Sequence, residues 1–379
     1  MRKKIAFIKW GVFSLANERI KHQLAKNFID FDIEIIDVSL INAKWFMFLN
    51  LLSTLFEYLP DLLSGRRNIK SAFFRTQFFF SEARRYVLRR LLRSQYAFTF
   101  QTQSLFDVST PGVPNFLYTD HTHLANLYYP SFKNDQLYPQ SWIVREKSIY
   151  HNAAINFTMS SNISRSLIEQ YGCPSNKVVC AYAGGNTISN DFASENDGYS
   201  NQSILFVGVD WERKGGPELV EAFKLVLETC PDAKLIIVGC SPNVCLQNCI
   251  VVGRVDAVAL SEYYRKASVF CLPTKIEPFG FVFLEAMSYK LPIVATKIGA
   301  IPDFVIDGES GYLLASGDVR GLAAMLVKLL QDPDACSTFG RRGYEVLSGK
   351  YTWDNVGAVI KRSIDSILVN EIQGLTPHN

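Results

Sequence analysis

The sequence predicts an α/β protein built from two doubly wound domains. Three observations carry this prediction: the length of 379 residues, the hydrophobic content of 48%, and β-rich runs that alternate with helix-length segments. A chain of this length exceeds one ordinary core, because domains usually hold about 100 to 200 residues. Continuous Val, Ile, Leu and Phe runs separated by helical patterns are typical of parallel sheets covered on both faces.

The candidate strands fall into two series. The first series is KIAFI at 4–8, IEIIDV at 33–38, AFTFQ at 97–101, NFLYT at 115–119, INFTM at 155–159 and VVCAY at 178–182. The second series is SILFVGV at 203–209, KLIIVG at 234–239, CIVVG at 249–253, SVFCLP at 268–273 and PIVAT at 292–296. Between them, the polar stretch 184–202 is rich in Gly, Asn and Ser and is the expected linker.

Charge and cysteine content exclude some classes of protein. The formal net charge of +3 is too small to predict nucleic-acid binding on its own. The basic start MRKK leads into an apolar run that Lys9 interrupts, so the N-terminus is predicted to be a first strand and not a signal peptide. The eight cysteines lack CxxC pairs, and the cluster 240, 245 and 249 lacks a fourth zinc ligand at standard spacing. We expect reduced thiols in a cytosolic protein and no metal site.

The stretch GVDWERKGG, 208–216, follows a predicted strand and precedes a helix that starts near Pro217. Arg213 and Lys214 therefore lie in a strand-to-helix loop, where glycines allow close backbone approach and the helix N-terminus favours an anion. A diphosphate suits this chemistry, with Lys214 as a point charge and Arg213 able to bind two oxygens. The alternative is a pair of solvated loop charges.

The stretch LPTKIEPFGFVFLEAM, 272–287, has the same layout of strand, loop and helix. Glu277 falls in the loop, and Glu285 lies about a turn and a half inside the predicted helix. A carboxylate in such apolar surroundings either caps local backbone or meets a polar ligand. For Glu285, hydrogen bonding to a polyol-bearing ligand is favoured over proton transfer.

Two histidines follow the predicted strand NFLYT in the stretch TDHTHLANLYYP. Ligands of open α/β sheets bind at the carboxyl ends of the strands, so His121 and His123 are both candidates for a ligand held in a cleft between the domains. Asp120 is a candidate to orient either ring. The alternative for each is a histidine satisfied by local backbone.

The motifs together resemble glycosyltransferase family 4, retaining enzymes of the GT-B fold. The resemblance rests on EPFGFVFLEAM with its E-x7-E spacing, on GAIPDFVIDGESGYLL at 299–314 and on GVDWERKGG, and it extends to REKSIYHNAAINFTMSSNISRSLIEQYGCPSNKVVCAYAGGN at 145–186. It implies two Rossmann-like domains facing across a cleft. These are an acceptor-side domain over 1–190, a nucleotide-sugar-binding domain over 200–355 and a last helix, 356–379, returning to the first domain.

The resemblance also implies a role for each matched residue. His121 and Glu277 would face the donor sugar as catalytic residues, and Glu285 would hold the ribose hydroxyls. The other implied donor-binding residues are Gly11, Arg213, Lys214, Arg254, Phe279, Gly280 and Phe281. Val209 stands where many family members place an arginine, so the second phosphate charge would come from Arg213.

The implied activity is a metal-independent, retaining hexosyl transfer that needs no cofactor. A UDP-, GDP- or ADP-sugar would be the co-substrate, and an unknown hydroxyl group the acceptor. A nicotinamide-dependent oxidoreductase is disfavoured, because KWGVFSLANE after the first strand lacks G-x-G-x-x-G. A GT-B protein that binds or isomerises a sugar nucleotide without transferring it remains the alternative.

The segment 45–93 indicates a second kind of partner. Its first part is apolar, but Asn50, Glu57 and Pro60 interrupt it before the roughly 20 residues that a membrane span needs. Over 65–93, eight arginines and one lysine stand against Glu82 alone, a net charge of +8 interleaved with aromatic residues. This pattern predicts peripheral contact with an anionic membrane and a lipid-linked or membrane-proximal acceptor. A solvated helix face and an acidic protein partner stay open. RNA is a weaker third alternative because no known binding module surrounds the segment, so nucleic acid is not the predicted partner.

Overall fold

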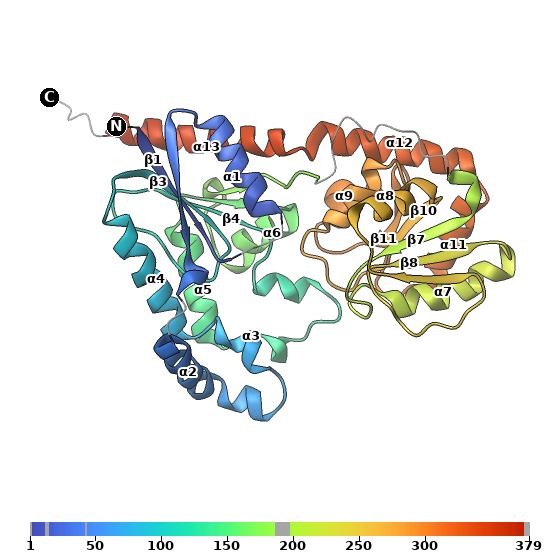
Figure 1. Cartoon of the computed structure of the whole chain (residues 1–379), viewed down its shortest axis with the longest axis horizontal. Helices are drawn as coiled ribbons and strands as arrows, with labels where there is room; N and C mark the ends of the chain where they lie inside the picture. Colours follow the sequence, from blue (N-terminus) through green and yellow to red (C-terminus); the bar gives the residue numbers. More distant parts are fainter. Residues whose placement is uncertain (1, 12–14, 42–43, 186–197, 375–379) are drawn as a thin grey trace. The chain divides into compact units, whose positions relative to one another are not determined.

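The computed structural model describes residues 2–11, 15–41, 44–185 and 198–374, so most of the predicted linker lies outside the described residues. The chain divides into two compact units. The first unit is Met1–Leu127, Phe132–Ala183 and Trp353–Asn379, and the second is Tyr128–Ser131 and Gly184–Thr352. Each unit contains a six-stranded parallel sheet with helices on it, which confirms the predicted α/β fold class (Figure 1).

The sheet of the first unit has the strand order β2-β1-β3-β4-β5-β6. Its strands are β1 (Lys3–Lys9), β2 (Phe31–Asp37), β3 (Tyr96–Thr102), β4 (Asn115–Thr119), β5 (Ile155–Thr158) and β6 (Val178–Cys180). All six lie within a residue or two of the predicted runs. The order reverses between β1 and β3, and ligands of such sheets bind beyond the carboxyl ends of the strands at this point.

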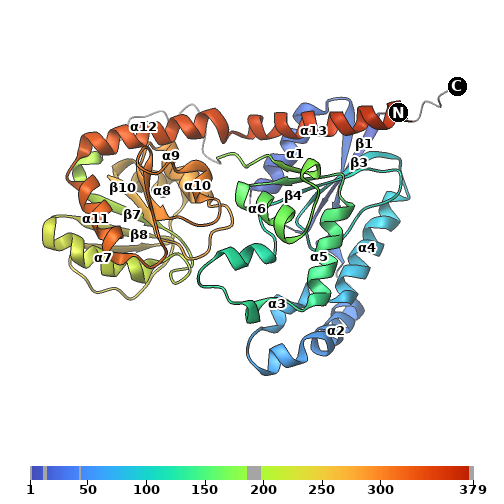
Figure 2. The same cartoon turned by 180° about the vertical axis from the view of Figure 1, so that it is seen from behind.

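Helices cover both faces of this sheet. They are α1 (Ala16–Asn27), α2 (Lys44–Leu63), α3 (Ile69–Phe73), α4 (Gln77–Leu91), α5 (Gln140–Asn152), α6 (Ser161–Arg165) and α13 (Trp353–Gly374). α4 and α5 lie on one face, and α1 with α13 on the other (Figure 2). α4 begins where the Thr76 side chain accepts a hydrogen bond from the Phe79 backbone N–H, which caps one of the free donors of the first turn.

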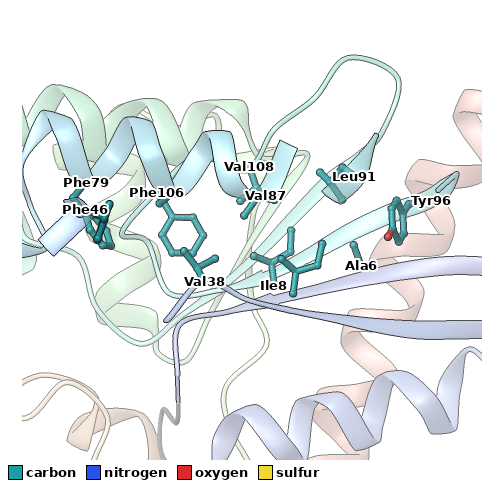
Figure 3. Packing of buried hydrophobic residues seen from close by; sticks show 12 residues of the cluster. Ala6, Ile8, Val38, Phe46, Phe79, Val87, Leu91, Tyr96, Phe106 and Val108 are labelled. Carbon is teal, nitrogen blue, oxygen red and sulfur yellow. The ribbon is translucent and has the colours of Figure 1, made fainter. Parts of the chain in front are cut away.

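A hydrophobic core lies between α4 and the sheet of the first unit, and alternate residues of β1 point into it. Ala6 and Ile8 of β1 point toward Val87 and Leu91 of α4, with Phe106 filling the space beside them (Figure 3). The intervening residues of β1 face the other helix layer. Each Val, Leu, Ile or Phe side chain buried in this way stabilises the fold by about 1.5 to 3 kcal/mol.

α13 joins the first unit from the far end of the sequence. Its Val356, Ile360 and Ile364 are buried, and it packs along α1. Asp354 accepts hydrogen bonds from Gln23 at 3.0 Å and Lys26 at 2.8 Å, both on α1. The last described helix therefore belongs to the layer that covers the first sheet.

The second unit repeats the architecture with the strand order β12-β11-β10-β7-β8-β9. Its strands are β7 (Ser203–Val207), β8 (Lys234–Val238), β9 (Cys249–Gly253), β10 (Val269–Leu272), β11 (Ile293–Thr296) and β12 (Gly311–Leu314). Its helices are α7 (Gly216–Thr229), α8 (Ala257–Lys266), α9 (Phe281–Ser288), α10 (Ile301–Phe304), α11 (Val319–Leu330) and α12 (Pro333–Lys350). The order reverses between β7 and β10, so the loops that follow these neighbouring strands meet.

Two interpretations of the segment 45–93 need correction. The apolar part is not interrupted, since α2 runs unbroken through Pro60. Asn50, Thr54 and Tyr58 recur every four residues and share one buried face, so these polar residues leave the other face of the helix apolar. Within the parts of the chain that the structure describes, α2 is the one helix whose length and mean hydropathy, 1.2, could cross a membrane. Burial of its polar face against the domain instead fixes it alongside α3 and α4.

The basic part carries less free charge than +8. Arg67 pairs with Asp61 at 3.1 Å, and Arg84 pairs with Asp107. Both aspartates lie outside 65–93, so a count over that window misses them. The exposed positive charge of the segment therefore comes from fewer side chains than the sequence indicated.

Candidate functional site

The loops after β7 and β10 are joined by hydrogen bonds. The Lys275 backbone N–H donates to the Arg213 carbonyl oxygen at 2.8 Å, and the Arg213 guanidinium donates to the Ile276 carbonyl oxygen at 2.8 Å. Thr274 Oγ1 also donates to the Arg213 carbonyl at 3.2 Å. The structure thus brings the two motifs of the second unit together at the point where its strand order reverses.

At the centre of these loops, Lys214 Nζ and Glu277 Oε2 form an ion pair. Both residues are buried. A buried charge is costly unless it is paired, and each member here supplies the partner of the other. Glu277 is therefore not a solvated charge, and it caps no backbone N–H among the residues that the structure describes; Lys214 is not a free surface lysine.

Two glycines make this arrangement possible. Gly215 has φ +75°, and a Cβ there would collide with the Pro273 carbonyl oxygen. Gly280 has φ +94°, and a Cβ there would lie 2.7 Å from the Phe283 ring and 3.1 Å from Glu277 Cγ. α9 begins directly after Gly280, and no side chain caps it. The backbone N–H groups of its first turn thus remain suited to an anion.

Glu285 lies on α9, one turn into the helix. It is half-buried, and Tyr264 Oη donates a hydrogen bond to its Oε2 at 3.3 Å. Burial raises the pKa of this carboxyl, and the Tyr264 bond opposes the shift. Tyr264 is itself held by stacking on Tyr289, with ring centroids 5.1 Å apart. One carboxylate oxygen is thus positioned from within the domain.

The remaining predicted residues of this unit differ in burial and in their partners. Phe279 is buried and packs on Phe281, with ring centroids 4.9 Å apart. Arg213 also pairs with Asp210 at 3.2 Å, so its guanidinium is already engaged. Arg254 follows β9 at the sheet edge and is exposed, and within the described ranges no hydrogen bond or ion pair joins it to the cluster.

In the first unit, His121 and His123 follow β4, and their environments differ. His123 Nε2 accepts a hydrogen bond from the Tyr138 backbone N–H at 2.7 Å, so this ring is satisfied locally. His121 Nδ1 is enclosed, and it has no hydrogen-bond partner among the described residues. Burial and the nearby Arg75 lower the pKa of His121 to about 4 and that of His123 to about 3. Both rings are therefore neutral at pH 7.

Asp120 and Gly11 complete the predicted set. Burial raises the pKa of Asp120 to about 6. Gly11 lies in the loop after β1 with φ +57°, and its backbone N–H donates to Asp37 Oδ1 at 2.9 Å. This amide is used within the domain. Residues 12–14, which follow it, lie outside the described residues.

The family model "Glycosyl transferases group 1" matches residues 201–332, a range that contains both loops and the ion pair. A curated relative, the phosphatidyl-myo-inositol mannosyltransferase of Mycobacterium leprae, is 32% identical over 176 residues, which are 44% of this chain and 47% of the relative. The second unit is thus similar in sequence to the group 1 glycosyltransferases. The chain spans about half the length of the curated relatives it matches.

Solved structures of glycosyltransferases share the fold across nearly the whole chain. Sucrose-phosphate synthase from Thermosynechococcus elongatus superimposes with a TM-score of 0.67 at 17% identity, covering 97% of this chain and 100% of that one. Alr3699/HepE from Anabaena, in complex with UDP and glucose, gives 0.63 at 15% identity, covering 96% and 100%. At such identities the similarity establishes the GT-B fold.

One pocket of the first unit was not predicted from the sequence. Arg67, Arg75, Tyr138 and Trp142 line a pocket together with His121. The only signal in the sequence was the mixture of basic and aromatic residues in 65–93, which we interpreted as a membrane-facing surface. No sequence signal pointed to Tyr138 and Trp142, because they are distant from the two arginines in sequence and contact them only in the folded protein.

Proposed function

We propose that this protein is a retaining, metal-independent hexosyltransferase that moves a sugar from a nucleoside-diphosphate sugar to a hydroxyl acceptor. One observation carries the proposal. A buried Lys214–Glu277 pair lies beside the uncapped start of α9, at the strand-order reversal of a segment that matches a glycosyltransferase family.

The second unit would bind the donor. The diphosphate would rest against the first turn of α9 with Lys214 as its cation, because helix N-termini and lysines both stabilise phosphates. Glu285, held on one side by Tyr264, would accept hydrogen bonds from the ribose hydroxyls. The Anabaena structure with UDP and glucose supports a nucleotide-sugar donor, and UDP-, GDP- and ADP-sugars are all candidates.

In the proposed reaction, the bond from the anomeric carbon to the phosphate oxygen breaks, and a bond to the acceptor oxygen forms on the same face of the sugar. The acceptor proton leaves with the diphosphate. Lys214 and the α9 amides would stabilise the charge that develops on the leaving group. His121, neutral at pH 7 with a free Nδ1, would hydrogen-bond the donor sugar, and Glu277 would face the same sugar.

Product analysis tests this proposal. We expect release of nucleoside diphosphate from a donor panel to need an acceptor, to persist in EDTA, and to give a product with the donor's anomeric configuration by NMR. Donor binding without acceptor-dependent release would favour the alternative, a GT-B protein that binds or isomerises a sugar nucleotide. An inverted product would refute retention.

The first unit supports a membrane-proximal acceptor. Trp45, Phe48, Phe56 and Leu59 are among the large apolar side chains that α2 exposes along one face, Phe56 to 88%. The opposite face is fixed inward, for example by Tyr58 Oη donating to the Arg75 carbonyl oxygen at 2.9 Å. An amphipathic helix of this kind can lie in the plane of a lipid surface. We therefore propose a cytoplasmic protein on the inner face of the membrane with a lipid-linked acceptor, and the relative named for phosphatidyl-myo-inositol supports this.

A further inference from the structure

A polar pocket of about 440 Å³ opens at the carboxyl ends of β3 and β4 in the first unit. The loop after β3 contributes Gln103, and the loop after β4 contributes Asp120 and His121. Arg75 and Tyr138 line it from segments outside the sheet. Its size is in the range of small-ligand sites, and it lies on the side of the sheet where α/β proteins bind ligands.

The two arginines on the pocket wall are not equivalent. Both guanidinium groups lie over the Tyr138 ring, Arg67 at 3.8 Å and Arg75 at 4.5 Å from the centroid. Arg67 is neutralised by Asp61. Arg75 donates to the Ser71 carbonyl oxygen at 2.8 Å, but no carboxylate pairs with it in the described ranges. Arg75 is therefore the available cation of this pocket.

Two further groups on the pocket wall have unused hydrogen-bonding atoms. Trp142 Nε1 and His121 Nδ1 are both enclosed and lack partners among the described residues. An enclosed polar atom without a partner costs free energy, which a ligand that pairs with it recovers. The indole can only donate, whereas the one N–H of the neutral His121 ring is engaged by Asn126, which leaves Nδ1 as an acceptor.

The pocket also has an acidic side. Glu146 is already occupied, because it accepts hydrogen bonds from the His123 backbone N–H and from Tyr150 Oη, both at 3.0 Å. Asp120 lies next to His121 and is mostly ionised at pH 7. Apart from the ion-paired Arg67 and the occupied Glu146, Arg75 and Asp120 are thus the charged side chains that the described residues place on the pocket wall.

We propose that this pocket binds the acceptor through a phosphate group held by Arg75, while Asp120 accepts a hydrogen bond from an acceptor hydroxyl. This inference rests on the proposed function, since it names the chemical class of the acceptor. A phosphate suits the site better than a carboxylate, because its several oxygens can accept from the Arg75 guanidinium and from Trp142 Nε1–H together.

Three small probes test the assignment by calorimetry: glycerol 3-phosphate, glycerate and glycerol. Wild-type protein is expected to bind glycerol 3-phosphate best and glycerol not detectably. Arg75→Gln should weaken phosphate binding at least about tenfold, which corresponds to 1.4 kcal/mol, and Arg75→Lys should keep part of it. Arg85→Gln, an exposed arginine paired with Glu82 outside the pocket, is the matched control and should bind as wild type does.

Equal affinity for glycerate, or unchanged phosphate affinity in a folded Arg75→Gln protein, would overturn the proposal. Circular dichroism of each variant identifies unfolding, and Arg75→Lys keeps the test valid if Arg75→Gln does not fold. The double variant Lys214→Met/Glu277→Gln should still bind glycerol 3-phosphate while losing the nucleotide sugar, because the two sites lie in different units. If wild-type protein binds glycerol 3-phosphate but no nucleotide sugar, the proposed function is refuted and the phosphate site is not.

The phosphate can belong to a soluble ester or to a lipid headgroup. Sedimentation with vesicles of an anionic phospholipid distinguishes these sources. If Arg75→Gln lowers sedimentation as well as glycerol 3-phosphate binding, the acceptor phosphate is a lipid headgroup. If it affects only the soluble ester, the acceptor is soluble. Both results support phosphate recognition.

Discussion

The Lys214–Glu277 pair determines how single residues of the second unit can be tested. Removing one member leaves the other charge buried and unpaired, which typically costs about 3 to 5 kcal/mol. Lys214→Ala would thus report on stability as much as on ligand binding. Replacing both members by neutral residues of similar size avoids this difficulty.

The first prediction concerns donor affinity. Glu285→Gln and the double variant Lys214→Met/Glu277→Gln should each weaken binding of the nucleotide sugar by about 1.5 to 3 kcal/mol per lost charge-assisted hydrogen bond. Calorimetry measures the affinity, and urea unfolding measures stability. Lys224→Ala removes a surface lysine paired with Glu221 in the same unit and should change neither. Wild-type affinity in both site variants would eliminate the proposed donor site.

The second prediction concerns His123 and pH. Its pKa lies near 3 in the folded protein against an ordinary value of 6.5, so unfolding takes up a proton between these values. Its contribution to stability is complete above pH 6.5 and is lost as the pH falls, because protonation breaks the bond from the Tyr138 N–H. His123→Gln can still accept that bond. Relative to the variant, wild type should lose about 1.4 kcal/mol per pH unit between pH 6 and 4. Parallel urea-unfolding profiles at pH 7, 6 and 5 would contradict this.

For single residues, the sequence predicted the residue types and motifs of the sites but not which residues pair with one another. Glu277 was identified as an unusual carboxylate, yet Lys214, 63 positions earlier, is its partner only because β7 and β10 are neighbours. The roles of His121 and His123 could not be separated either. Only the fold shows that a backbone N–H from residue 138 satisfies one ring and leaves Nδ1 of the other free.

Among the elements, α2 differs most from the sequence prediction. Polar residues within an apolar stretch looked like interruptions, although they form the inward face of a single amphipathic helix. The buried strands were predicted well, because continuous apolar runs bounded by turns are a strong signal. β12 was missed: GYLL is only four residues long, and the polar residues around it resemble a loop.

The third prediction follows from the exposed face of α2. Wild-type protein should sediment with anionic vesicles and not with neutral ones, and the interaction should weaken with salt because exposed charges are screened over about 10 Å at 0.1 M. Phe48→Glu/Phe56→Glu should abolish binding, since two charges would enter the lipid interface. Val258→Glu is the matched control. Val258 is 78% exposed, an exposure similar to that of Phe56, but it lies on α8 in the second unit.

Substitution of Arg85 and Arg89 by glutamine measures the electrostatic contribution to vesicle binding. Both are exposed, whereas Arg84 is held by Asp107 and should contribute little. Equal recovery of wild type in the supernatant with both vesicle types at low salt would rule out the membrane proposal. The apolar face of α2 would then have to meet a protein.

For the whole molecule, the fourth prediction is that ligands protect the two units separately. A nucleotide sugar at 100 times its dissociation constant should stabilise the unit that binds it by about 2.7 kcal/mol. Hydrogen exchange should then show new protection in 208–216 and 272–287. Glycerol 3-phosphate should instead protect the loops after β3 and β4. Identical protection patterns for both ligands would refute two independent sites.

The GT-B fold as a whole was predictable because each half of the chain carries its own alternation of strands and helices. The pocket of the first unit was not, since its walls come from four separate segments. No local pattern marks residues that converge only after α2, α3 and α5 have packed on the sheet.

The position of α13 has a consequence for how the chain folds during synthesis. The first unit needs residues from 353 onward to cover α1, so this face of the unit stays open until α13 has been synthesised. The second unit contains all its strands and helices between 198 and 352 and can fold while α13 is still inside the exit tunnel. The unit that is translated later is therefore the first that can be completed.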